Sequence, residues 1–278
     1  MSRIQKRFAD LKAQNRTAFV PFVTAGDPDF DTSLAIIEEL AGAGADLIEL
    51  GVPFSDPMAD GPSVQAASLR ALGAGMNLPR VLDMVRRFRK GDAQTPIILM
   101  GYYNPIHAYG TARFAKDAGE AGVDGLIVVD LPPEEDEVLR VPALAQGLDV
   151  VRFVTPTTND ARLETVLKDA TGYLYYVSIT GVTGTKSFDE NVVRVGVERV
   201  RKHTALPVAV GFGIRTPDQA RAIAGIADGT VVGSAIVDRI AEGVKNGADK
   251  ETIVKDVLEF CASLAKSVHA ASPAAVVE

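Results

Sequence analysis

The sequence predicts an α/β protein that folds as one TIM, or (β/α)8, barrel, and three observations support this fold class. The chain has 278 residues, close to the roughly 250 residues typical of such a barrel. Eight short apolar runs rich in Val and Ile recur along it, separated by segments of helical length. No Gly-x-Gly-x-x-Gly motif follows the first run, where an open dinucleotide-binding sheet would carry one. A closed barrel is therefore favoured over a doubly wound open sheet.

The eight apolar runs are the expected strands. Each run is too short for a helix, and most lack polar residues at alternate positions, so each predicts a parallel strand that is buried on both faces. In chain order they are residues 18–23, 47–50, 96–100, 125–129, 150–154, 174–177, 207–210 and 230–232.

Amphipathic segments between the runs predict the helices. Within residues 31–43, Leu34, Ile37 and Leu40 recur at the spacing of one helical face. Residues 216–227 open with Thr-Pro-Asp-Gln, a capping-box pattern with Pro at the first helical position. The other expected helices are residues 3–15, before the first strand, residues 63–74, an extra helix after the second strand, and residues 77–89 and 249–266.

Composition limits the class of protein. No linker divides the chain, so we expect a single domain over residues 1–278, with residues 267–278 as a frayed tail. The 29 Lys and Arg against 36 Asp and Glu give a net charge of −7, which argues against a nucleic-acid-binding face. With Cys261 as the one cysteine, neither an internal disulfide nor a four-cysteine metal site can form. The N-terminus lacks the apolar core of a signal peptide, and no apolar stretch approaches the roughly 18 residues of a membrane span, so we expect a soluble cytoplasmic protein that handles small molecules.

Glu49 is the first candidate for chemistry. In a TIM barrel the active site lies at the carboxyl ends of the strands. Alternation along the second strand places Ile48 and Leu50 toward the helices and Glu49 toward the barrel mouth. A carboxylate in apolar surroundings responds with a raised pKa, which suits a general acid or base near neutral pH. The alternative is a structural pair with a nearby Arg.

The loop that follows this strand carries two more acids, Asp56 and Asp60. Three prolines stiffen the loop and Gly61 permits a sharp turn. Either acid can cap a turn, and either can supply a second carboxylate opposite Glu49. Loop composition alone does not decide between these roles.

Other polar groups lie at strand ends. Asp130 closes the fourth strand, where a catalytic role and a loop anchor are equally compatible with the sequence. Tyr173, Tyr175 and Tyr176 cluster at the sixth strand, and alternation places Tyr173 and Tyr175 on one face. A phenol that reaches the mouth can hydrogen-bond a substrate, whereas aromatic core packing is the commoner arrangement.

Glycine-rich segments at three neighbouring strand ends predict phosphate binding. They are residues 181–184, 211–213 and 233–234, after strands six, seven and eight. Glycine lets backbone N–H groups approach an anion closely, and a helix N-terminus adds the positive end of its dipole. Barrels often bind phosphate with these loops.

The positions of the His and Lys residues argue against metal-dependent and Schiff-base chemistry. His107, His203 and His269 are scattered without metal-ligand spacing, so we expect no metal site. None of the eight runs contains a lysine for a Schiff base. What remains is acid–base chemistry by carboxylates on a phosphorylated substrate, typical of a lyase or isomerase.

Five segments resemble the tryptophan synthase α subunit family. The most specific is the block LIELGVPFSDPMADGP at residues 47–62. The others are PFVTAGDP at residues 21–28, YYNP at 102–105, SITGVTG at 178–184 and GFGI at 211–214. The resemblance extends from about the first helix to near Ala265. It implies a TIM barrel that cleaves indole-3-glycerol phosphate to indole and glyceraldehyde 3-phosphate, a retro-aldol reaction of tryptophan biosynthesis.

The resemblance also implies roles for individual residues. Glu49 would protonate indole C3 and assist deprotonation of the glycerol hydroxyl, Asp60 would stabilise positive charge at the indole nitrogen, and Tyr175 would orient the substrate. The remaining positions implied are Phe22 and Met100 in the indole pocket, Thr183 in a loop that closes over the ligand, Gly184, Gly213, Gly233 and Ser234 at the phosphate, and Pro53, Phe54 and Asp56 at the interface with a β subunit.

The same resemblance implies a partner. The chain would need no cofactor of its own, since pyridoxal phosphate belongs to the β subunit, which receives the indole in an α2β2 heterotetramer. Three alternatives stay open: another phosphate-binding barrel such as a sugar-phosphate isomerase or prenyl transferase, a non-catalytic activating subunit, and an autonomous lyase that releases free indole.

Overall fold

Parallel strands form the central sheet of the computed structural model, which describes residues 1–178, 189–211 and 213–271. They pair in the order β5-β4-β3-β2-β1-β9-β8-β7-β6. The strands are β1 (Ala18–Thr24), β2 (Ile48–Gly51), β3 (Ile97–Gly101), β4 (Gly125–Val128), β5 (Asp149–Val150), β6 (Arg152–Val154), β7 (Leu174–Val177), β8 (Val208–Gly211) and β9 (Gly229–Val232).

The two strands at the ends of this order are pieces of one extended segment. Val151 separates β5 from β6, and its N–H donates to the carbonyl of Leu126 on β4 at 3.0 Å. The pairing therefore runs round a barrel rather than ending at open edges. The expected strand at residues 150–154 is thus interrupted, because its first part pairs with β4 and its second part with β7.

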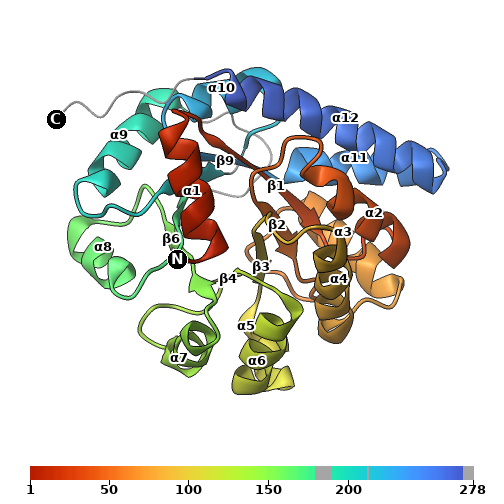
Figure 1. Ribbon diagram of the computed structural model, residues 1–278, viewed down its shortest axis with the longest axis horizontal. Coiled ribbons are helices and arrows are strands. Elements are labelled where there is room, and N and C mark those ends of the chain that lie inside the picture. The colour runs from red at the N-terminus through yellow and green to blue at the C-terminus, as the bar shows by residue number, and fades with distance from the viewer. Residues whose placement is uncertain (179–188, 212, 272–278) are drawn as a thin grey trace.

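Helices surround the strands, as Figure 1 shows. They are α1 (Arg3–Ala13), α2 (Phe30–Leu40), α3 (Pro62–Gly73), α4 (Leu78–Gly91), α5 (Tyr103–Tyr109), α6 (Thr111–Ala121), α7 (Glu137–Ala145), α8 (Asp160–Leu167), α9 (Glu190–Arg201), α10 (Pro217–Ala224), α11 (Ser234–Lys245) and α12 (Lys250–His269). No helix in the described ranges has both the length and the apolar character needed to cross a membrane.

The helix boundaries follow the local sequence signals in most places. At α10 the Thr216 side chain accepts from the Gln219 N–H, and the Gln219 side chain returns to the Thr216 N–H, which confirms the predicted capping box. The two extra helices, α1 and α3, are present as expected. Helix α5 was not expected from the sequence. Helix α12 runs to His269 with Val268 buried, so the start of the segment expected to fray is helical instead.

Two separate apolar clusters fill the molecule. The outer cluster lies between strands and helices and includes Ile48 and Leu50. The inner cluster fills the barrel itself and includes Ile4, Phe8 and Leu11 of α1, which lies across the strands in Figure 1. Helix α1 thereby closes the amino-terminal end of the barrel, and the opposite end remains for the functional site.

Candidate active site

Glu49 lies inside the barrel. It pairs in register with Phe22 on β1 and Ile98 on β3, and both of these side chains belong to the inner cluster. Its chain neighbours Ile48 and Leu50 belong to the outer cluster. The predicted orientation of Glu49 is therefore confirmed, because side chains alternate between the two faces of a strand.

The carboxyl of Glu49 is buried with one hydrogen-bond partner among the described residues. Its side chain is 0% exposed, and its Oε1 accepts a hydrogen bond of 2.6 Å from the phenol of Tyr173. Its Oε2 is buried and has no hydrogen-bond partner among the described residues. Burial raises the pKa of Glu49 to about 8, and the Tyr173 hydrogen bond offsets this only in part. Glu49 is therefore a neutral acid at pH 7.

Asp60 sits in the loop between β2 and α3, in a more accessible setting. Burial raises its pKa to about 6, and a hydrogen bond with the Tyr102 phenol acts in the opposite direction. Tyr102 directly follows β3, and its oxygen also accepts from the Ala59 N–H at 3.0 Å. At pH 7 Asp60 is therefore mostly anionic. The two carboxyls thus differ in charge within one site, the arrangement that separates acid and base roles.

A small pocket of about 10 Å³ opens beside Asp60. The expected pocket residues Phe22 and Met100 line it, together with Asp60 and Tyr102. Val64 and Val129 add apolar side chains to its wall. Glu49 does not line this cavity; it lies next to Phe22 in the sheet register, deeper in the barrel.

Tyr175 points into the barrel, on the same face as Tyr173, whereas Tyr176 packs in the outer cluster, as alternation predicted. The Tyr175 ring packs against the Phe153 ring, with ring centroids 5.1 Å apart. Gly211 makes room for it, because a Cβ at residue 211 would lie 2.0 Å from the Tyr175 oxygen. Burial raises the pKa of Tyr175 well above its usual value, and the nearby Glu49 and Asp60 carboxyls add to this. The phenol therefore stays protonated.

The described positions of the expected phosphate site lie at neighbouring strand ends. Gly213 follows β8 with a φ of +78°, a conformation that favours glycine. Gly233 precedes α11 as its N-cap and Ser234 is the first helical residue. A Cβ at Gly233 would lie 3.3 Å from the Phe22 ring, so this helix begins beside the cavity wall. Thr183 and Gly184, with the rest of the loop at residues 181–184, lie outside the described residues.

The expected interface loop follows β2. Pro53 is buried and Phe54 packs on Tyr102 with ring centroids 5.5 Å apart. Asp56 is exposed, and its carboxylate accepts from the Ser55 hydroxyl at 2.6 Å. Met58, two residues further on, is 78% exposed. The loop thus places both a charge and a large apolar side chain in solvent.

Asp130 has a structural contact. Its carboxylate accepts from the Tyr103 N–H at 2.8 Å, at the first residue of α5. Asp130 therefore anchors the start of α5, which is one of the structural roles compatible with the sequence. Among the described residues, no group of three or more His, Cys, Asp or Glu side chains is arranged to hold a metal ion.

Sequence reasoning missed Tyr102 and the bond between Tyr173 and Glu49. Tyr102 follows the third strand at its carboxyl end, which is a signal that identifies it as a site residue in hindsight. Tyr173 precedes β7 and gives no such signal. Its contact with Glu49 spans 124 positions of the chain.

Comparison with known proteins identifies the family. A family model described as tryptophan synthase alpha chain matches residues 8–269. The chain belongs to the tryptophan synthase alpha chain family. It is therefore a carbon–carbon lyase of tryptophan biosynthesis that cleaves indole-3-glycerol phosphate to indole and glyceraldehyde 3-phosphate.

Solved structures of tryptophan synthase alpha chains agree over nearly the whole length. The subunit alpha from Legionella pneumophila str. Paris is 40% identical, with a TM-score of 0.89 over 96% of this chain and 98% of that one. A chain in a structure of Mycobacterium tuberculosis tryptophan synthase is 34% identical, with a TM-score of 0.87 over 96% and 98% of the two chains. The chain thus shares the architecture of these proteins over nearly its whole length.

Proposed function

We propose that Glu49 and Asp60 carry the lyase reaction as a neutral acid and an anion. The observation that carries this proposal is the difference between the two carboxyls, since the pKa of Glu49 is raised to about 8 and that of Asp60 to about 6. Between about pH 6 and pH 8, Glu49 is mostly protonated and can donate a proton, whereas Asp60 is mostly ionised and can stabilise a positive charge. Glu49 lies on β2 and Asp60 lies in the loop that follows β2, so both would act on one substrate.

One proton moves from Glu49 to the substrate and is later recovered from it. Glu49 gives its proton to C3 of the indole ring, and the positive charge that forms at the ring nitrogen is stabilised by Asp60. The ionised Glu49 then takes the proton of the hydroxyl next to the scissile bond. As the oxygen forms the aldehyde carbonyl, the bond to C3 breaks and its electron pair neutralises the ring. Indole and glyceraldehyde 3-phosphate leave, and Glu49 is protonated again.

The remaining residues hold the substrate. Phe22 and Met100 would enclose the indole ring in the cavity beside Asp60, and Tyr175 would orient the atoms between the two carboxyls. The phosphate would lie at Gly213, Gly233 and Ser234, where a glycine with positive φ and the start of α11 offer backbone N–H groups. Thr183 and Gly184 would complete this end of the site.

A β subunit is the proposed partner. Pro53, Phe54 and Asp56, with the exposed Met58, would form the contact. The assembly would be an α2β2 heterotetramer in which pyridoxal phosphate is bound by the β subunit alone. Indole release from indole-3-glycerol phosphate, measured for the purified chain before and after a β subunit is added, tests this contact: stimulation supports it, and an unchanged rate contradicts it.

The role of Glu49 is tested by Glu49→Gln. The amide keeps the shape and accepts the Tyr173 hydrogen bond, but it has no acidic proton to transfer. We expect the rate of indole release to fall by about 10²- to 10⁴-fold, the usual contribution of general acid–base catalysis. Binding of glycerol 3-phosphate, followed by calorimetry, should persist. Full turnover of this variant would refute the role of Glu49.

A further inference from the structure

The two oxygens of the Glu49 carboxyl are not equivalent. Oε1 accepts the phenol of Tyr173 at 2.6 Å. Oε2 is buried without a hydrogen-bond partner in the described part of the chain. In a neutral carboxyl the carbonyl oxygen accepts and the hydroxyl oxygen carries the proton. A donor fixed on Oε1 therefore favours the form in which Oε2 bears the hydrogen.

Tyr173 is well placed to remain that donor. It is 0% exposed, and burial, with the Glu49 carboxyl beside it, raises the pKa of its phenol well above the usual value. It stands two residues before Tyr175 on the same inward face, further from the barrel mouth. Tyr173 thus approaches Glu49 from the closed side of the barrel.

Helix α1 holds the Tyr173 ring in place. The ring of Phe8 packs against it with centroids 5.6 Å apart and an interplanar angle of 48°. Phe8 is 5% exposed and belongs, with Ile4, to the part of the inner cluster that α1 supplies. The helix that closes the amino-terminal end of the barrel therefore also supports the phenol beneath Glu49.

We infer that Tyr173 is a positioning residue that holds Oε1 of Glu49 and leaves Oε2 as the oxygen that delivers the proton to the substrate. The inference rests on the proposed role of Glu49 as the acid. No new bond is formed by Tyr173: its own proton stays on the phenol, while the proton on Oε2 passes to the substrate carbon and is recovered from the substrate hydroxyl.

The test compares Tyr173→Phe with Tyr176→Phe. Tyr176 is a matched control, because it is similarly buried at 1% exposure and lies in the adjoining strand β7, but its side chain belongs to the outer cluster. For Tyr173→Phe we expect kcat for indole release to fall by about 10- to 100-fold with KM within about twofold. The control should keep both constants.

A second readout separates positioning from packing. Carbon-13 NMR of labelled glutamate carboxyls, with Glu49→Gln to assign the signal, reports the titration of Glu49 directly. Loss of the phenol removes a hydrogen bond that favours the ionised carboxylate, so Tyr173→Phe should move this titration upward by about one pH unit. The basic limb of the pH–rate profile should move with it.

The outcomes distinguish the two claims. An unchanged Glu49 titration and an unchanged kcat in Tyr173→Phe would overturn the inference, and so would equal losses in Tyr176→Phe. A shifted titration with a normal rate would also overturn the inference, because the hydrogen bond would then not position the acid, whereas the role of Glu49 itself is judged by the rate of Glu49→Gln. Should Tyr173→Phe fail to fold, Phe8→Leu keeps the phenol but loosens its support; we expect a smaller fall in kcat at constant KM, and no fall would count against the inference.

Discussion

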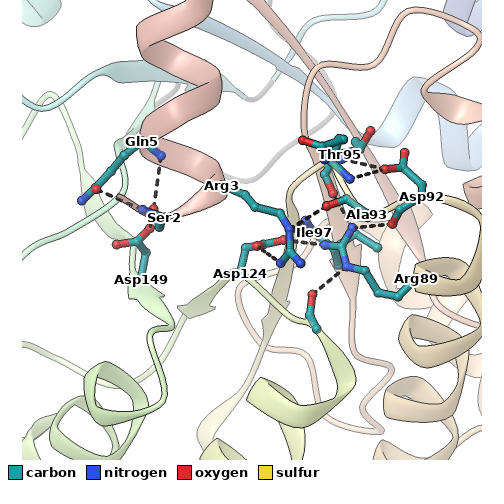
Figure 2. Close-up of polar contacts among 12 residues, drawn as sticks. Ser2, Arg3, Gln5, Arg89, Asp92, Ala93, Thr95, Ile97, Asp124 and Asp149 are labelled. Carbon is teal, nitrogen blue, oxygen red and sulfur yellow. Dashed lines mark hydrogen bonds and ion pairs between the residues drawn. The ribbon is translucent and has the colours of Figure 1, made fainter.

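Asp124, at the amino-terminal end of the barrel, is bonded to two arginines, whereas Glu49, inside it, is bonded to one phenol. Figure 2 shows Arg3 and Arg89 converging on Asp124, at 2.8 and 2.5 Å. The carboxylate also accepts the Ile97 N–H at 2.8 Å, at the start of β3. Glu49 has no such cation within the described structure. The two arginines compensate the charge of Asp124, whereas burial of Glu49 disfavours its ionisation.

Two other aspartates repeat the pattern of Asp124. Asp46 accepts the Phe19 N–H at 2.9 Å and pairs with Arg16. Asp228 accepts the Val208 N–H at 2.8 Å and pairs with Arg201 at 3.0 Å. Each aspartate stands one or two residues before a strand and satisfies an N–H in the first two residues of a neighbouring strand.

Carboxyls at the two ends of the barrel therefore differ in role: those at the closed end stabilise the fold, and the one toward the mouth is suited to acid–base chemistry. At the closed end, ion pairs and N–H donors fix the strands. Toward the mouth, a carboxyl is buried with little compensation, which costs stability when it ionises and supplies an acid near neutral pH. The following variants test this division, beginning with the largest expected effect.

Asp124→Ala should give the largest loss of stability. It leaves Arg89, whose side chain is 10% exposed, without its carboxylate and leaves the Ile97 N–H unpaired. Breaking a buried pair from one side costs about 3–5 kcal/mol. Urea unfolding should show this loss, while kcat of the folded protein stays normal. Asp83→Asn is the control, since its pair with Arg87 is half exposed and is worth about 0.5 kcal/mol or less. Equal effects of the two variants would contradict the comparison.

Glu49→Gln should instead increase the free energy of unfolding. The pKa of Glu49 is raised from 4.5 to about 8 in the fold, so the stability of the parent protein is greatest below pH 4.5 and falls as pH rises to about 8. Glutamine does not ionise. The variant should therefore gain about 3 kcal/mol over the parent at pH 7 and almost nothing near pH 4.5. Parallel urea unfolding curves at several pH values measure this gain, and a pH-independent difference would argue against an uncompensated carboxyl.

Asp60→Asn should lower the rate less than Glu49→Gln does. Because burial raises the pKa of Asp60 to about 6, its anion is present above that pH, and neutral Glu49 is present below about 8. The parent profile of kcat/KM should be bell-shaped between these limits. In Asp60→Asn we expect a fall of about 10- to 100-fold and loss of the acidic limb. An acidic limb that persists near pH 6 would assign that limb to another group.

The sequence by itself determined the barrel and the direction of its key side chain. The apolar runs located the strands, and the alternation of Ile48, Glu49 and Leu50 pointed the carboxyl inward, because strand periodicity is a local property. Capping at Thr216 followed local rules in the same way.

Tertiary structure alone decided which groups surround the two carboxyls. The phenol of Tyr173 reaches Glu49 across 124 positions of the chain, and Tyr102 reaches Asp60 from a different strand. These contacts depend on barrel closure and strand register, which no local pattern encodes. The pKa values of Glu49 and Asp60 follow from burial in the folded barrel. The sequence supplied two acids, and the fold keeps Glu49 mostly neutral and Asp60 mostly anionic at pH 7, because packing controls their access to water.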